Sequence, residues 1–320
     1  MFLAHPLFRL APDDTKIPFM KGRHLGIAFS VILSVLSVVL AFYPGLEKGI
    51  DFRGGILMEI RTEGPADLGA IRSSVADLGL GEVGVQEFGD ASTVLVRLPV
   101  QGDEAATQQT VNQVRGALNE AAPGSRLVRT EAVGNRISSE LFTGSLIALG
   151  LSMLAMMAYI WFRFEWQFAI GAVVTLLLET TKVVGFLAVT RIEFSLATVA
   201  AALTIIGFSV NDKVVVYDRM RENLRKFKTM PLRQVIDRSI NETLNRTLGT
   251  SVTLLLSALP LALFGGDTLA GFAWTMVFGI VASTSSSIFI SAPILLYLGE
   301  NRLRRGTEAA GGVKPQPKAG

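Results

Sequence analysis

The stretch LGIAFSVILSVLSVVLAFYPGL, residues 25–46, decides the class of protein to which this chain belongs. It holds 22 consecutive residues without a charge. A bilayer core of about 30 Å is crossed by roughly 20 helical residues. The run is longer than the core of a signal peptide, and no A-x-A cleavage pattern follows it. We therefore expect residues 25–43 to form a membrane-spanning helix that stays in the protein.

Five further apolar runs of similar length follow. The spans that they predict are residues 141–162, 167–190, 194–217, 247–265 and 268–298. Half of all residues are hydrophobic, only 18% are charged, and the mean hydropathy is +0.45. These values lie outside the range of ordinary soluble domains. The sequence thus predicts a bundle of six transmembrane helices, the last five of them within residues 141–300.

Lys and Arg gather on one side of the six-span arrangement, where they predict the cytoplasmic face. They stand before the first span, between the second and third, between the fourth and fifth, and after the sixth. The short turns on the opposite side hold a single basic residue, Arg191. We therefore expect residues 1–24 and the tail 301–320 to be cytoplasmic, and residues 44–140 to lie outside the membrane, in the periplasm.

The outer segment has the alternating and amphipathic patterns of a domain that folds in water. Predicted strands cover residues 56–62, 83–88, 93–98 and 126–133, and predicted helices cover 65–78 and 103–121. A hairpin signal, Gly89-Asp90, joins the second and third strands. The order βαββαβ predicts an α+β domain with the ferredoxin-like plan.

Several kinds of chemistry are not expected. The chain has no cysteine and only two histidines, His5 and His24, so neither disulfides nor thiolate or histidine metal sites are predicted. Gly54-Gly55 lacks the Lys-Ser/Thr of a nucleotide loop. The pI near 9.3 comes from basic residues beside apolar runs, without a zinc-ligand or RNA-stacking motif. We expect no cofactor, no nucleic-acid partner and no enzymatic activity, whereas membrane lipid is an expected contact.

Charged residues inside the apolar runs are the candidates for proton coupling, because a charge at the centre of a membrane helix costs at least ~2.5 kcal/mol. Asp212 has two interpretations. It could lie in an Asn-Asp turn wetted by headgroup water, or it could titrate within the bundle, paired with Arg246 at the start of the next span. Arg246 by itself could also be a simple cytoplasmic anchor.

Glu179 and Lys182 are spaced i, i+3 and could neutralise one another on one helix face. Alternatively, Glu179 could face Asp212, in which case the like charges would favour a shared proton. Lys213 is expected to snorkel or to act as a local counter-charge.

Residues 218–245 mix basic and acidic side chains around regularly placed apolar ones. This pattern predicts an amphipathic segment on the cytoplasmic surface. It could be a solvated connector or a docking surface for a partner complex.

Four stretches resemble the SecF branch of the SecD/SecF family, which belongs to the resistance-nodulation-division (RND) superfamily. GIDFRGG (49–55) is similar to the G-x-D-F-x-G-G signature of the outer domain, and WFRFEW (161–166) is similar to the turn after the second helix. The most specific stretch is IGFSVNDKVVVYDRMREN (206–223), and TLNRT (243–247) resembles the start of the fifth helix. The motif positions that the resemblance marks are Gly49, Asp51, Phe52, Gly54, Gly55, Asn211, Asp218, Arg219, Arg221, Glu222 and Asn223.

Three positions depart from the family pattern. Asn135 stands where proline is usual, and Arg53 stands where threonine is common. Glu179-Thr180 occupies the place of the family's intramembrane His-Asp pair, so a carboxylate is kept there without the histidine.

The resemblance implies a multi-pass protein of the bacterial inner membrane that acts in the Sec pathway. It implies SecD, the SecYEG channel and YajC as partners, preproteins as substrates, and protons as the source of energy through positions that match Asp212 and Arg246. Two rival interpretations stay open. An RND exporter of small molecules or lipids would usually carry two large outer domains rather than one modest domain, and a passive scaffold would use Asp212 and Arg246 only structurally.

Overall fold

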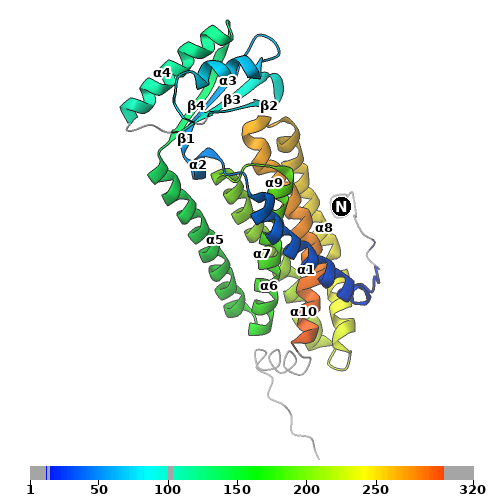
Figure 1. The fold of residues 1–320 in the computed structure, drawn as a ribbon. Helices are drawn as coiled ribbons and strands as arrows, with labels where there is room; N and C mark the ends of the chain where they lie inside the picture. The colour runs from blue at the N-terminus through cyan, green and yellow to red at the C-terminus, as the bar shows by residue number, and fades with distance from the viewer. Residues whose placement is uncertain (1–11, 13–14, 82, 100–103, 299–320) are drawn as a thin grey trace, which may run out of the picture.

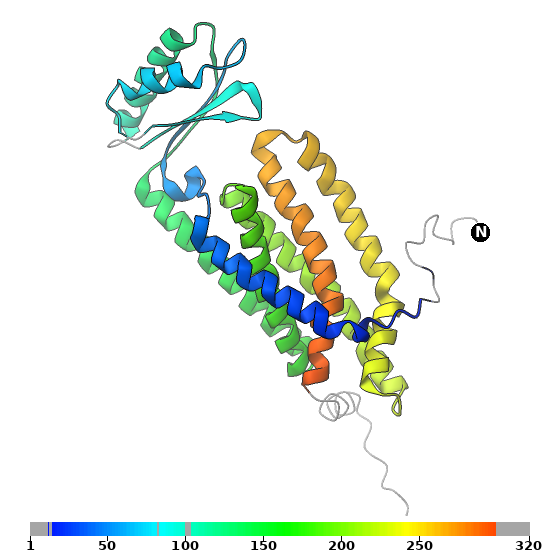
Figure 2. The same ribbon diagram turned by 45° about the vertical axis from the view of Figure 1, so that its right-hand side comes forward.

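The computed structural model describes residues 12, 15–81, 83–99 and 104–298. A bundle of long helices carries a small sheet domain at one end (Figure 1). The same division is seen after a 45° turn (Figure 2), where α1 lies across the face of the bundle. His5 and the cytoplasmic tail expected over residues 301–320 lie outside the described residues.

Six helical stretches within the described residues are long and apolar enough to cross a membrane, as the sequence predicted. They are α1 (Arg23–Leu40), α5 (Asn135–Arg163), α6 (Trp166–Thr190), α7 (Leu196–Lys226), α8 (Leu232–Phe264), and a last stretch built from α9 (Gly266–Ser286), the π-helical turn η4 (Ser287–Ser291) and α10 (Ala292–Tyr297). The π turn interrupts what the sequence predicted as one regular helix.

The predicted amphipathic segment 218–245 is not a separate surface element. Its residues form the end of α7 and the beginning of α8, which are joined only by residues 227–231. The two helices continue beyond their apolar runs because polar side chains pair across them: Asn223 Nδ2 donates to Ser239 Oγ at 3.0 Å. Hydropathy alone therefore ended the fourth predicted span too early, at residue 217, and began the fifth too late, at residue 247.

Small residues allow the helices to pack closely. A Cβ atom added to Gly185 of α6 would collide with the side chain of Ser37 of α1, and one added to Gly279 of α9 would collide with Ile205 of α7. Close backbone approach at small residues is a general feature of membrane helix packing. The main core lies between α6, α7, α8 and the last stretch, around Phe168 and other fully buried side chains.

The outer domain confirms the ferredoxin-like prediction. Its elements are β1 (Gly55–Arg61), α3 (Leu68–Ala76), β2 (Gly84–Phe88), β3 (Asp90–Leu98), α4 (Glu104–Ala121) and β4 (Arg126–Val133). The sheet order is β2-β3-β1-β4, with all neighbours antiparallel. Helix α3 begins later than predicted because Asp67, not Pro65, caps it by accepting from the N–H groups of Gly69 and Ala70.

The two faces of the sheet have different neighbours. Alternate residues such as Met58 and Val96 pack under α3 and α4 in a separate apolar core. The intervening residues, such as Leu57 and Leu95, face the outer ends of the membrane helices across a cavity. Helices α3 and α4 thus lie on the side of the sheet away from the bundle (Figures 1 and 2).

Candidate functional site

Four charged side chains are buried on two neighbouring helices of the bundle. Glu179 and Lys182 of α6 are 2% and 5% exposed, and Asp212 and Lys213 of α7 are 2% and 0% exposed. Both pairs stand near the middle of their helices. An ion in the membrane interior needs a partner. The contacts of these four side chains therefore show which of their charges are paired within this chain.

Glu179 is paired with Lys213 and not with Lys182. The Lys213 Nζ to Glu179 Oε1 distance is 3.0 Å, and the Ser209 hydroxyl donates to the other carboxylate oxygen. Lys182 instead donates to Ser286 Oγ of α9 at 3.2 Å. The expected direct pair of Glu179 and Lys182 is therefore not formed. Lys213 does not snorkel, and it serves as the counter-charge of Glu179.

Among the described residues Asp212 has no ion-pair partner, although it stands beside Lys213 in the sequence and feels its charge. Its carboxyl interacts with the side chains of Thr247 of α8 and Ser287 of η4. None of these contacts has regular hydrogen-bond geometry, since Asp212 Oδ2, Thr247 Oγ1 and Ser287 Oγ are all buried without a hydrogen bond among the described residues. Helix α7 runs through this position without a turn, so the interpretation of Asp212 as part of a headgroup-wetted turn is wrong.

Arg246 lies on α8 next to Thr247, but its side chain is exposed. It stands one helical turn further along α8 than Glu242, which contacts Arg219 of α7. Among the described residues no ion pair joins Arg246 to Asp212 or to another carboxylate. The predicted Asp212–Arg246 pair is thus not formed within this chain, although the two residues lie at similar depths of the bundle.

Most of the motif residues in 206–223 tie helix ends together on the side away from the outer domain. Asp218 pairs with Arg163 at 3.2 Å, and Arg221 lies 3.5 Å from Glu165. The second and third motifs therefore meet in space, across the turn between α5 and α6. The remaining contacts of this group are Arg219 with Glu222 and Glu242, and Asn223 with Ser239 and Glu242. Asn211 is exposed on α7.

The outer signature, residues 49–55, fixes the outer domain to the start of α7. Asp51 Oδ2 accepts from the backbone N–H of Leu196 at 2.8 Å, and the N–H of Gly49 donates to the Phe194 carbonyl at 2.9 Å. Phe52 is buried against Phe194, with ring centroids 5.0 Å apart.

The glycine pair at the end of this signature has a conformational reason. Gly54 and Gly55 have φ angles of 70° and 131°, which residues other than glycine rarely adopt. A Cβ atom on Gly55 would lie 2.7 Å from the Leu98 carbonyl oxygen. Glycine is therefore required where β1 begins beside the end of β3.

A second ion pair joins the same two parts of the molecule. Arg97 of β3 contacts Glu193, which lies in the turn between α6 and α7. Sequence reasoning missed this pair, because nothing in the local pattern relates residues 96 positions apart. The Ser209–Lys213 contact, in contrast, could have been found from its i, i+4 spacing.

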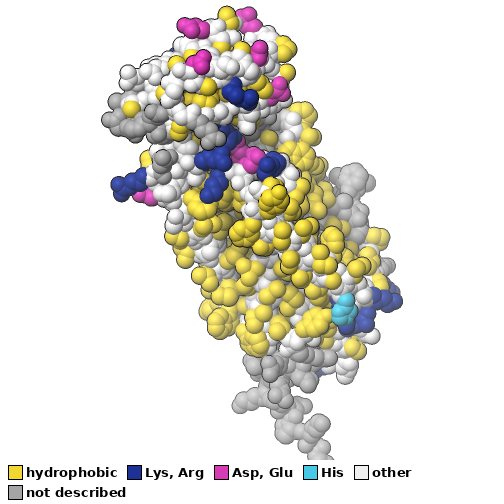
Figure 3. Space-filling view, viewed as in Figure 1, with side chains coloured by type: hydrophobic (Ala, Val, Ile, Leu, Met, Phe, Trp, Pro, Cys, Tyr) yellow, Lys and Arg dark blue, Asp and Glu magenta, His cyan; other side chains and the backbone are white. Residues whose placement is uncertain are grey.

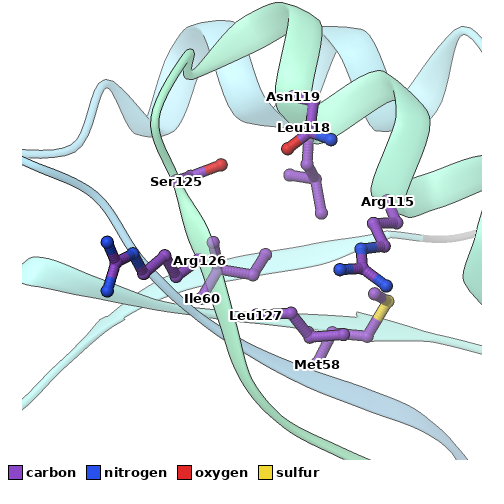
Figure 4. A pocket seen from close by; sticks show the side chains of 8 residues that line it. All are labelled: Met58, Ile60, Arg115, Leu118, Asn119, Ser125, Arg126 and Leu127. Carbon is purple, nitrogen blue, oxygen red and sulfur yellow. The ribbon is translucent and has the colours of Figure 1, made fainter.

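The outer domain also contains a cavity of about 310 Å³ between α4 and β4. Arg115, Asn119 and Ser125 extend toward it over a floor of apolar side chains (Figure 4). The floor includes Met58 and Leu118 of the domain core. This cavity lies in the outer domain, far from the buried charges, and takes no part in their chemistry. Among the described residues, no group of His, Cys, Asp and Glu could hold a metal ion.

Comparisons with known proteins agree with these motifs. Residues 113–301 match the family "Protein export membrane protein SecD/SecF, C-terminal", and residues 44–66 match the "SecD/SecF GG Motif". The chain is 39% identical over 319 residues to protein translocase subunit SecF of Cereibacter sphaeroides, covering 98% of this chain and 96% of that protein. It is 41% identical to the SecF subunit of Rickettsia akari, covering 91% and 94%.

Solved structures give the same result. The crystal structure of SecDF, a translocon-associated membrane protein from Thermus thermophilus, matches 90% of this chain with a TM-score of 0.81 and 30% identity. SecDF in the super-membrane-facing form matches 96% with a TM-score of 0.64 and 29% identity. The chain spans about two-fifths of these SecDF chains, 39% and 41%. By its family matches, its relatives and its fold, this chain belongs to the SecD/SecF family of protein-export membrane proteins, in the SecF branch.

Proposed function

We propose that the chain is the SecF subunit of a SecD–SecF complex that uses the proton-motive force to promote preprotein translocation through the Sec pathway. The observation that carries the proton part of this proposal is the Asp212 carboxyl, which is 2% exposed and has no ionic or regular hydrogen-bond partner for Oδ2 among the described residues. Glu179 is a weaker candidate for carrying the proton, because Lys213 and Ser209 already balance its charge.

Helix α7 offers a mechanical route from Asp212 to the outer domain. Protonation would remove the charge beside Thr247 and Ser287, which changes how α7 packs against α8 and the π turn η4. The N-terminal end of α7, next to the outer domain, is held by Asp51, whose carboxylate accepts from the N–H of Leu196. A shift of α7 would therefore be transmitted to the domain that meets preproteins on the outer side. No covalent bond in the substrate changes, so the role is that of a transport subunit and not of an enzyme.

The energy is sufficient for such a shift. One elementary charge moved through 100 mV yields ~2.3 kcal/mol. This is comparable with the ~2.5–3.5 kcal/mol that a charge costs at the centre of a membrane helix.

A partner of the SecD type is supported by what this chain leaves exposed. Arg246 presents its guanidinium at the bundle surface without a described ion pair. An exposed cation inside the bilayer is costly, so we propose that a carboxylate of the partner faces it. Six helices also make up only half of a pseudo-symmetric transporter bundle. From the family relationship, the SecYEG channel and YajC are proposed as further partners.

We propose the inner membrane as the location, with both termini cytoplasmic. The basic residues that set this orientation lie at the ends of α5, α7 and α8 away from the outer domain. A reporter enzyme fused after Lys228 is expected to be cytoplasmic. A periplasmic signal from that fusion would reverse the proposed orientation.

The test of proton coupling is export kinetics, normalised to membrane abundance, with the proton gradient present and then collapsed. Asp212→Asn is expected to abolish the gradient-dependent part of export while membrane insertion and partner binding stay normal. Asp77→Asn, an exposed carboxylate on the outer domain, is the matched control and should keep the stimulation. Retained stimulation in Asp212→Asn would refute Asp212 as the residue that couples the gradient to export.

Arg246→Met is expected to have the same effect on export as Asp212→Asn, and the double variant should be no worse than either single variant. Residues that act through one shared step behave in this way. If the two losses instead add, Arg246 and Asp212 serve separate steps.

A further inference from the structure

A basic pocket lies at the junction between the outer domain and the membrane helices. Its volume is about 470 Å³, and its charged lining consists of Lys48, Arg53 and Arg97. They come from the loop after α1, from the short helix α2 (Ile50–Arg53) and from β3. The described lining contains no carboxylate.

The neighbouring carboxylates neutralise only part of this positive charge. Glu193 pairs with Arg97. Glu47 pairs with Arg191 at 3.3 Å, and Asp51 accepts from the start of α7. Among the described residues, Arg53 has no ion-pair partner, so the pocket keeps an excess of positive charge.

Two cations of the pocket also act on each other. Burial lowers the pKa of the Arg97 guanidinium, and the nearby charge of Arg53 lowers it further. Arg97 Nε is buried and has no hydrogen-bond partner among the described residues. Lys48 is held over the ring of Phe142, with Nζ 4.6 Å from its centroid. An anion in the pocket would relieve the repulsion and supply the missing acceptor.

The position of the pocket relative to the bilayer indicates where such an anion comes from. Phe42 and Tyr43, at the end of the first span, are each 84% exposed, as aromatic residues at a membrane–water interface are. Lys48 follows Tyr43 by five residues. The space-filling view shows basic side chains gathered where the sheet domain meets the apolar surface of the bundle (Figure 3).

We propose that this pocket binds the phosphodiester headgroup of an anionic phospholipid from the outer leaflet of the membrane. Lys48 and Arg53 contact the phosphate as exposed cations, and Arg97 supplies a partly buried donor. The lipid would brace the outer domain against the bundle. The proposal is independent of proton transfer at Asp212.

The absence of cysteine from the chain makes a direct measurement possible. Pro99 lines the pocket and is exposed, so Pro99→Cys carries an environment-sensitive dye there. The labelled full-length chain in neutral detergent is titrated with phosphatidylglycerol, with phosphatidylcholine, and with inorganic phosphate. We expect half-saturation with phosphatidylglycerol at a concentration ~25-fold lower than with phosphatidylcholine, because each basic residue near an anionic lipid contributes ~1 kcal/mol and two exposed ones, Lys48 and Arg53, line the pocket.

Variants test the assignment to residues. Arg53→Gln and, separately, Lys48→Gln are each expected to weaken the phosphatidylglycerol response ~5-fold. Arg126→Gln, an exposed arginine of the same domain outside this pocket, should leave the response unchanged. The proposal is overturned if both pocket variants bind like the parent chain or if the two lipids bind equally. Saturation by inorganic phosphate alone would refute a lipid as the source of the anion.

Discussion

The buried pair of Glu179 and Lys213 permits the sharpest test of the arrangement inside the bundle. Lys213→Met would remove the ammonium 3.0 Å from Glu179 Oε1 and leave that carboxylate with the Ser209 hydroxyl as its direct partner. Glu179→Gln would leave the Lys213 ammonium equally alone. Neither side chain can reach water easily, since both are almost completely buried.

The magnitude follows from the distance. Two unit charges 3.0 Å apart attract by about 5–6 kcal/mol at an effective dielectric constant near 20. In the intact pair, the cost of desolvating both charges offsets much of this attraction. When one partner is removed, the remaining charge still carries its desolvation cost and no attraction offsets it. We therefore expect either single variant to lose about 3–5 kcal/mol of unfolding free energy, which is the usual result of breaking a buried pair.

Removal of both charges should restore most of the stability. The double variant Glu179→Gln/Lys213→Met is expected within about 1 kcal/mol of the parent chain, because buried pairs and well-packed neutral side chains are often equivalent in energy. Lys182→Met is the matched control. It removes a buried ammonium whose direct partner is the neutral Ser286, so it should be less destabilising than Lys213→Met.

The measurement is equilibrium unfolding of the purified full-length chain in mixed micelles, followed by helix circular dichroism. The losses expected above for the single and double variants imply a coupling free energy of at least about 5 kcal/mol between the two positions. If the single variants add without coupling, Glu179 and Lys213 are not partners. Equal losses in Lys182→Met and Lys213→Met would show that Glu179 uses both lysines alike.

Three further expectations concern the outer domain. A reporter fused after Gln101 should be periplasmic, and a cytoplasmic signal would remove the first crossing from the topology. Residues 49–133 expressed alone should fold without metal or reductant, since they have their own core and no cysteine; random-coil amide shifts in an NMR spectrum would contradict this. In that domain Gly55→Ala should cost at least about 1 kcal/mol, because its Cβ would meet the Leu98 carbonyl at a strained φ, whereas Gly116→Ala, in open space on α4, should be neutral or stabilising in the same thermal melt.

Local sequence patterns were sufficient to predict the membrane spans and the order of elements in the outer domain. Six spans could be predicted because the length of each apolar run is set by the bilayer, independently of the rest of the chain. The βαββαβ order could be predicted because alternation and helix punctuation are short-range signals, and β4 was placed at its observed bounds, Arg126–Val133. The bounds of α7 and α8 were missed because pairs such as Asn223 with Ser239 join helices, and hydropathy does not register them.

The sequence by itself also identified Glu179, Asp212 and Lys213 as unusual, because a charge in an apolar run is visible without a structure. Only the tertiary structure decided their partners. Lys182 is three residues from Glu179 and Lys213 is 34 residues away, yet the rotation and packing of α6 against α7 bring Lys213 to the carboxylate. The same packing directs Asp212 toward Thr247 and leaves Arg246 on the surface, because neighbouring residues on α8 point in directions about 100° apart.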